Sequence, residues 1–403
     1  MNNDEGQGVG DGLKRRIGLG LLTAYGIGVM VGAGIYVLVG AVVADAGVWA
    51  PISFLIAGLI AVPTALSYAE FSTRIPEAAG EAIFVAKGLK VQWLGVAVGL
   101  VIVLAGTVSA GAVLRGGSGY FTALVDVPQD AAILGLGLFL TLVAVLGVLE
   151  SLSLAAVLTA VELIGLALVV WAGMRAPPSA DLMQIAPPVW AGIGAGVVLA
   201  FFAFIGFEDL VNMAEEVDRP TKNLPRAILL ALLITSLVYG LVAYAAVRAV
   251  PVAELSLSER PLALVWQRGG MGSAAVLSAI AVAAALNGVL AQIVMASRVL
   301  YGLGRRTGAL SLFHRANPRF GTPVLATLLI GAAVIGAALR LPVATLAETT
   351  SALLLCVFVM VNLSLIVLKR RQPEAPFHVP MTVPVLGLVL ALAALAVTFG
   401  VLA

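Results

Sequence analysis

The sequence contains little charge, little histidine and a single cysteine. Charged residues make up 11% of the 403 residues, whereas soluble domains carry about 25%. A chain that is 61% hydrophobic cannot cover itself with a polar surface, so the composition predicts a membrane protein. The lone Cys356 excludes a disulfide framework and a thiolate metal site, and His314 and His378 stand far from any metal-ligand spacing. We therefore expect no metal, no cofactor and, from the near-balanced net charge of +2, no nucleic-acid partner.

Long apolar runs fill most of the chain, and each is close to the length of about 20 residues that a helix needs to cross a bilayer. About 11 such spans are predicted, and they lie at residues 17–42, 50–70, 93–114, 131–149, 153–174, 190–213, 226–249, 274–297, 323–339, 345–368 and 382–402. The alternating strands of a membrane barrel are absent from the sequence. Lysines and arginines concentrate in alternate connections, which predicts that residues 1–16 are a cytoplasmic N-terminus and that the protein lies in the plasma membrane of the cell.

The first span contains the segment GIGVMVGAGIY, Gly26 to Tyr36, which is too rich in glycine for an ordinary helix. A dinucleotide-binding loop is excluded because Val31 stands where the third glycine is required and no strand precedes the segment. Two interpretations stay open. Gly28 and Gly32 form a G-x-x-x-G seam that lets membrane helices pack closely. Alternatively, the helix unwinds between Val31 and Gly34 and exposes amides that bind an anion.

The sixth span has a comparable interruption in the segment FFAFIGFEDL, Phe201 to Leu210. Gly206 lies in its middle and is followed by Glu208 and Asp209, although carboxylates inside a membrane are costly unless they face water or a partner. Interrupted helices at corresponding positions of two inverted repeats are typical of the substrate site of a transporter. The expected units are a first repeat at 17–174, a second repeat at 190–368 and one additional span at 382–402.

Four segments carry recognisable motifs. Span 1 has G-x-G-x-x-x-G-x-G-I from Gly26 to Ile35, and span 2 ends in SYAEFSTRIPEAAGEA at residues 67–82. Span 6 and its loop read FFAFIGFEDLVNMAEEVDRPTKNLPRAI at residues 201–228, and span 8 ends in SRVLYGLGR at residues 297–305. On these motifs the chain resembles the amino acid–polyamine–organocation permeases over nearly its whole length.

The resemblance implies an all-α polytopic membrane protein with two inverted five-helix repeats, discontinuous helices in spans 1 and 6, and one extra C-terminal helix. It also implies that freed amides of span 1 hold the carboxylate of an amino acid and that freed carbonyls of span 6 hold its amine, which agrees with the charges of helix ends. The residues expected to bind substrate are Met30, Gly32, Ala33, Gly34 and Ile35 in span 1 and Phe202, Ile205 and Gly206 in span 6. Phe202 also matches an aromatic gate of the family, and its alternative role is ordinary packing.

Two acidic residues are candidates for proton coupling. Glu162 lies near the middle of span 5, where some proton-coupled relatives carry a lysine, and Glu208 lies where relatives carry an acid implicated in proton sensing. A carboxyl group at membrane depth is a functional hypothesis by default. The alternative for both residues is a structural role, as a hydrogen-bonding group between neighbouring helices. Val282, Ala283 and Ala284 stand where sodium-coupled cousins carry paired hydroxyls, so a sodium site of that type is disfavoured.

We predict a secondary transporter that moves amino acids by alternating access, with the substrate, protons and the lipid bilayer as its partners and an undetermined oligomeric state. Exchange or export, and a non-transporting receptor on the same fold, are the alternatives. An enzyme is rejected because no nucleophile–base pair, metal cluster or cofactor motif lies in or near the spans. The lack of a fixed countercharge favours a small or apolar neutral substrate, although the sequence does not place the polar residues Thr107, Ser109, Asn287 and Ser351 relative to the site.

Overall fold

The computed structural model describes residues 17–31, 34–75, 80–146, 152–184, 186–213, 217–317 and 321–401. Within these ranges the chain is helical, and the only extended pairing is an isolated bridge between Ile17 and Val217. The helices are α1 (Leu19–Val31), α2 (Gly34–Ala46), η1 (Gly47–Trp49), α3 (Ala50–Arg74), α4 (Gly80–Leu89), α5 (Gln92–Phe121), α6 (Gln129–Leu146), α7 (Leu152–Arg175), α8 (Ala180–Met183), α9 (Trp190–Phe202), η2 (Glu208–Met213), α10 (Pro220–Ala249), α11 (Val252–Leu257), α12 (Pro261–Arg268), α13 (Ala275–Arg306), η3 (Gly308–Phe313), α14 (Val324–Arg340), α15 (Val343–Arg371) and α16 (Thr382–Thr398).

The lengths of these helices fit a protein that crosses a membrane several times. Among the described residues, seven helical stretches are long and apolar enough to span a bilayer, namely Gly34–Arg74, Gln92–Phe121, Gln129–Leu146, Ala156–Arg175, Pro220–Ala249, Ala275–Arg306 and Val343–Arg371. The shorter apolar helices are α1, α9, α14 and α16. The predicted class, an all-α polytopic membrane protein, is therefore confirmed, while the number of crossings and the inverted repeat stay predictions.

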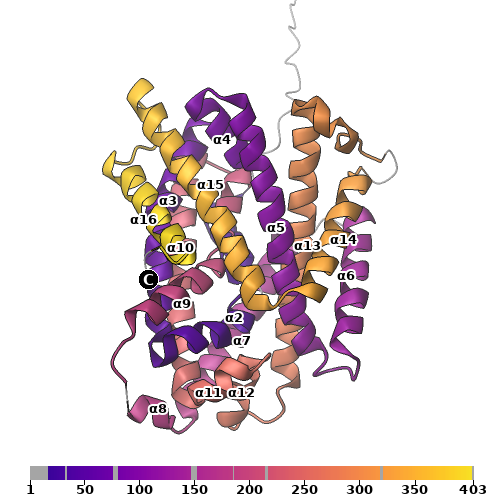
Figure 1. The fold of residues 1–403 in the computed structure, drawn as a ribbon, viewed down its shortest axis with the longest axis vertical. Coiled ribbons are helices and arrows are strands. Elements are labelled where there is room, and N and C mark those ends of the chain that lie inside the picture. The colour runs from indigo at the N-terminus through magenta and orange to yellow at the C-terminus, as the bar shows by residue number, and fades with distance from the viewer. Residues whose placement is uncertain are drawn as a thin grey trace, which may run out of the picture.

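The bundle is built from two groups of packed helices (Figure 1). In the view of Figure 1, α5, α6, α13 and α14 stand together on one side, whereas α3, α10 and α16 stand on the other. The long helices α5 and α13 run along each other, and small residues allow this close approach. A Cβ atom on Gly99 of α5 would lie 2.7 Å from Leu303 Cδ2, and one on Gly106 would lie 3.0 Å from Met295 Cε.

The two ends of the bundle differ in their short helices. In Figure 1, α4 lies at one end, and α8, α11 and α12 lie at the other. At the α4 end, the buried carboxylate of Glu70 accepts hydrogen bonds from Arg74 Nη2 at 2.6 Å, Lys369 Nζ at 2.7 Å and the N–H of Val379 at 2.9 Å. This ionic network ties α3 and α15 to the segment that leads into α16.

Candidate functional site

Of the two segments that the sequence analysis singled out, the second has an interrupted helix within the described residues. In the first, α1 ends at Val31 and α2 begins at Gly34, and the expected site residues Gly32 and Ala33 lie outside the described residues. In the second, α9 ends at Phe202, turns occupy residues 203–207, and the 3₁₀ helix η2 follows. The last carbonyl groups of α9 form short turn bonds, because those of Ala200, Phe201 and Phe202 accept the N–H groups three residues later at 3.0, 3.0 and 3.2 Å.

The two segments pack directly against each other. Gly206 has φ of +125°, and a Cβ atom there would lie 2.6 Å from Val29 Cγ1 and 3.3 Å from the backbone nitrogen of Met30. A Cβ on Gly34 would lie 3.3 Å from the Cα atom of Ala203. Glycine is required at residue 206 for both reasons, because other residues strain at this φ and the α1 backbone leaves no room for a side chain. The glycines thus bring backbone of one segment against backbone of the other.

The hydroxyl of Tyr239 in α10 contacts both segments, and sequence reasoning did not identify this residue. Its hydroxyl lies 2.6 Å from the carbonyl oxygen of Met30 and 2.9 Å from the carbonyl oxygen of Ala203. The side chain is fully buried, and its ring makes edge contacts with Phe54 and Phe204. Tyr239 therefore fixes the last turn of α1 relative to the turn that follows α9. Only its contacts distinguish it from other tyrosines in apolar helices.

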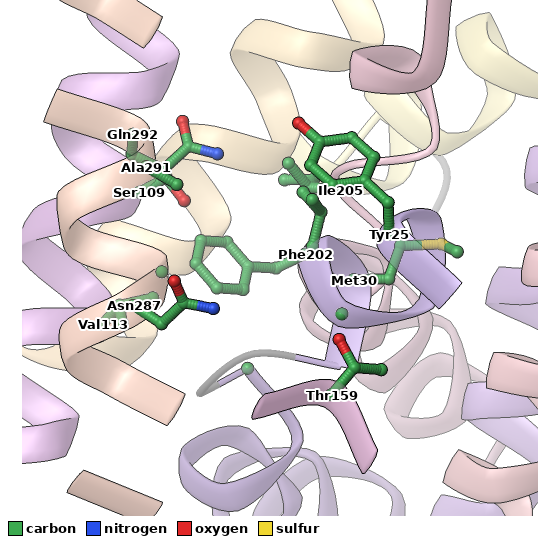
Figure 2. Close-up of a pocket in the computed structure, with 14 residues that line it drawn as sticks. Tyr25, Met30, Ser109, Val113, Thr159, Phe202, Ile205, Asn287, Ala291 and Gln292 are labelled. Carbon is green, nitrogen blue, oxygen red and sulfur yellow. The ribbon is translucent and has the colours of Figure 1, made fainter. Parts of the chain in front are cut away.

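A cavity of about 90 Å³ lies beside the two segments (Figure 2). It is lined by residues of α1, α2, α5, α7, α9, α13 and the turn after α9: Tyr25, Gly28, Val29, Met30, Gly34, Ser109, Val113, Thr159, Phe202, Ile205, Asn287, Gly288, Ala291 and Gln292. Of the expected site residues, the structure places Met30, Gly34, Phe202 and Ile205 together in this lining. Ile35 and Gly206 are not among the lining residues, because Ile35 is buried in the core and Gly206 faces α1.

Phe202 occupies a central position in the cavity. Figure 2 shows its ring extending between the polar side chains of Asn287 and Gln292 on one side and Met30 and Tyr25 on the other. Phe204, two residues later, instead packs against Tyr239 with a centroid distance of 5.2 Å.

Apart from Tyr25 of α1, the polar side chains of the lining come from three helices that the sequence analysis did not assign to the substrate site. Ser109 belongs to α5, Thr159 to α7, and Asn287 and Gln292 to α13. None of the lining residues carries a formal charge. A sequence signal for α13 existed, because Asn287, Gly288, Ala291 and Gln292 recur at helical spacing and form one face. Thr159 also lies against Gly28, where a Cβ would collide with its hydroxyl, so Gly28 acts as a packing position.

The two predicted coupling acids are buried but lie outside the lining of the cavity. Glu162 of α7 is 2% exposed, and its backbone carbonyl accepts a hydrogen bond of 3.2 Å from the Tyr36 hydroxyl. Glu208 is 6% exposed, and its Oε2 accepts the backbone N–H of Gly206 at 2.9 Å. The Glu208 side chain therefore bonds within its own interruption, whereas the sequence analysis considered a bond to a neighbouring helix.

Comparison with known proteins identifies the family to which this chain belongs. The family model described as Amino acid permease matches residues 17–403. The chain is 28% identical over 361 residues to the Branched-chain amino acid permease BcaP of Bacillus subtilis (strain 168), with 83% of this chain and 76% of that protein covered. It is 28% identical over 360 residues to the Methylthioribose transporter of the same organism, with 84% and 77% covered. The Cationic amino acid transporter 4, vacuolar, of Arabidopsis thaliana is 29% identical over 350 residues, with 80% of this chain and 58% of that protein covered.

Proposed function

Because this chain belongs to the amino acid permease family, we propose that it is a secondary active transporter that moves amino acids by alternating access. Membership of this family identifies the protein as a transporter in a membrane and not as an enzyme. The observation that carries the proposal is the cavity beside the glycine-rich segment of α1 and α2 and the interrupted segment after α9, which pack against each other at Gly34 and Gly206. Interrupted helices that line a cavity are the expected form of a transporter substrate site.

The helix ends supply complementary charges for an α-amino acid. We propose that the first span is broken between Val31 and Gly34, so that α2 presents amide N–H groups and the positive end of a helix dipole to a carboxylate. At the end of α9 the carbonyl of Phe202 accepts the N–H of Ile205 at 3.2 Å and keeps a second lone pair, which favours an ammonium group together with the negative end of the helix dipole. We propose that the carboxylate lies at Gly32, Ala33 and Gly34, and that the amine meets carbonyls at Phe202 and Ile205.

The proposed fold consists of two inverted five-helix repeats, residues 17–174 and 190–368, followed by α16. Support comes from the equivalent order of elements in the two parts. The third span of each part is a long helix, α5 and α13, that lines the cavity. The N-terminus is proposed to be cytoplasmic in the cell membrane, because the basic ends of α13 and α15 lie at the same end of the bundle as α4 (Figure 1).

Proton symport is the proposed coupling, and exchange or export is the alternative. Glu162 and Glu208 are the candidates, because both are acids buried among membrane helices. We expect Glu162→Gln to flatten the pH dependence of uptake into proteoliposomes, with Glu254→Gln, at an exposed residue of α11, as a control. A pH profile identical to that of the wild type would return Glu162 to a structural role.

The transport proposal is tested with purified protein in proteoliposomes. Uptake or exchange of labelled amino acids is expected for the wild type, whereas binding without accumulation or exchange would indicate a receptor and refute transport. Gly34→Leu is expected to abolish binding, because Gly34 lines the cavity and a Cβ there would already lie 3.3 Å from the Cα atom of Ala203. Gly20→Leu is a matched control on α1, since nothing lies within 4 Å of a Cβ there. Wild-type affinity in Gly34→Leu would remove the proposed carboxylate site.

A further inference from the structure

Besides Tyr25 of α1, two polar side chains that line the cavity have no hydrogen-bond partner in the described part of the chain. They are Ser109 of α5 and Gln292 of α13, and both line the cavity (Figure 2). Other hydroxyl groups on α5 behave differently: Thr107 donates to the carbonyl of Val103 at 2.7 Å, and Ser118 donates to that of Arg115 at 2.6 Å. The hydroxyl of Ser109 and the amide of Gln292 are therefore available to a ligand.

The position of Gln292 brings it close to the α5 backbone. A Cβ on Gly106 would lie 3.0 Å from Gln292 Oε1, so the small residue on α5 makes room for the amide. Ser109 lies less than one turn further along α5, and Asn287 lies on the same face of α13 as Gln292. Figure 2 shows these polar groups on the opposite side of Phe202 from Met30, which belongs to the segment proposed to hold the substrate backbone. They are thus placed for the side chain of an amino acid.

The chemistry of this wall distinguishes classes of amino acid. No lining residue carries a charge, so neither a cationic nor an acidic side chain would find a counterion. A hydroxyl and a carboxamide each donate and accept hydrogen bonds, which matches a neutral side chain that does the same. An apolar side chain would displace water from these groups and leave them unpaired, and sites built for hydrogen bonding reject such analogues strongly.

We propose that Ser109 and Gln292, supported by Asn287, form a hydrogen-bonding subsite that selects neutral amino acids whose side chains end in a hydroxyl or a carboxamide. The proposal rests on the transport function proposed above and names its substrate class. It keeps the neutral substrate expected from the sequence and proposes a hydrogen-bonding side chain, whereas the sequence favoured a small or apolar one.

The test compares substrate classes and then removes the two polar groups. Wild-type protein in proteoliposomes is offered labelled serine, threonine, asparagine and glutamine, and competition by valine, leucine, lysine and glutamate is measured. At least a 10-fold preference for the hydroxyl or carboxamide substrates over valine and leucine is expected. Gln292→Met and Ser109→Ala are expected to lower that preference by 10-fold or more. Gln267→Met on α12 and Ser118→Ala on α5 lie outside the cavity lining and are expected to leave it unchanged.

Each outcome decides between the two levels of the proposal. Uptake that favours leucine or valine in the wild type, or that favours lysine, would refute the polar subsite and leave the transport function intact. Wild-type preference that survives in both cavity variants would refute the roles of Ser109 and Gln292. The absence of any amino acid uptake or exchange would refute the transport function and the subsite with it. Should Gln292→Met fail to fold, Ser109→Ala and the wild-type panel decide the question.

Discussion

The ionic network at the α4 end predicts a large and specific loss of stability when Lys369 is replaced by methionine. The Nζ atom of Lys369 donates to both carboxylate oxygens of Glu70, at 2.9 and 2.7 Å, and to the carbonyl of Val379, at 2.6 Å. The side chains of Lys369 and Glu70 are 3% and 0% exposed, so solvent does not screen the pair. Methionine preserves most of the length of the side chain and removes the charge.

The expected loss in the free energy of unfolding depends on the hydrogen-bond partners that Glu70 retains. Removing one partner of a buried ion pair costs about 3–5 kcal/mol, because the remaining charge stays buried. Glu70 retains Arg74, whose Nε lies 2.9 Å from Oε1, and the N–H of Val379. We therefore expect the lower end of the range, about 3 kcal/mol. The double variant Glu70→Gln with Lys369→Met is expected to lose at least about 1 kcal/mol less than the sum of the single variants, because it leaves no unpaired charge from this pair.

Unfolding of the purified variants in detergent micelles, followed by tryptophan fluorescence, measures these differences. Arg370→Met is the matched control, since Arg370 is the next residue of α15 and is exposed to solvent. A change below about 0.5 kcal/mol is expected for this surface substitution. Lys369→Met and Arg370→Met variants of equal stability would refute the reasoning, and additive losses in the double variant would show that Lys369 and Glu70 act independently.

Three further predictions concern the interruptions and one buried acid. Gly206→Ala should abolish substrate binding, because φ of +125° and the α1 backbone both oppose a side chain, whereas Gly270→Ala, with φ of +69° and nothing within 4 Å, should retain binding. Tyr239→Phe leaves the two carbonyls of the interruptions without its hydroxyl, so a loss of about 1–3 kcal/mol in stability and a weaker substrate Kd are expected from unfolding and binding measurements. Burial raises the pKa of Glu81, in α4 outside the long apolar helices, to about 7 from 4.5. The folded state then binds this proton more tightly than the unfolded state, so its contribution to stability is complete below pH 4.5 and about 3 kcal/mol is lost as the pH rises through 7. Melting temperatures of the wild type and Glu81→Gln as a function of pH should diverge over this interval, and parallel curves would contradict the prediction.

The helical class and the interrupted segments were predictable because they depend on local composition. A bilayer requires long apolar helices, and glycine at positions such as Gly34 and Gly206 weakens a helix wherever it lies. Both signals depend on a few neighbouring residues, and the end of α9 at Phe202 agrees with the second, whereas the predicted break in span 1 lies outside the described residues. Motif resemblance then gave the family, because the motifs extend over several spans in the right order.

The polar wall of the cavity and the tyrosine bond were not predictable, because they depend on how distant helices face one another. Ser109 and Gln292 stand 183 positions apart in sequence and meet only because α5 and α13 pack together. The same holds for Tyr239, whose hydroxyl reaches carbonyl groups 209 and 36 positions away. Apolar helices in lipid show little amphipathic pattern, so the sequence does not reveal which face of each helix lines the cavity.

Arginines also occur at the end of the bundle opposite α4, where the positive-inside rule expects few basic residues, and their hydrogen bonds explain why. Arg115 Nη1 donates to the carbonyl of Ala338 at 2.7 Å, and Arg248 Nη1 donates to the carbonyl of Gly173 at 2.7 Å. These carbonyls belong to the last turns of α14 and α7, where helices carry unpaired acceptors and the negative end of their dipole. A partly buried arginine bonded in this way is retained for the helix end that it satisfies, whichever side of the membrane it faces. Orientation is therefore better predicted by counting only the exposed basic residues. Those at the ends of α13 and α15 lie at the α4 end.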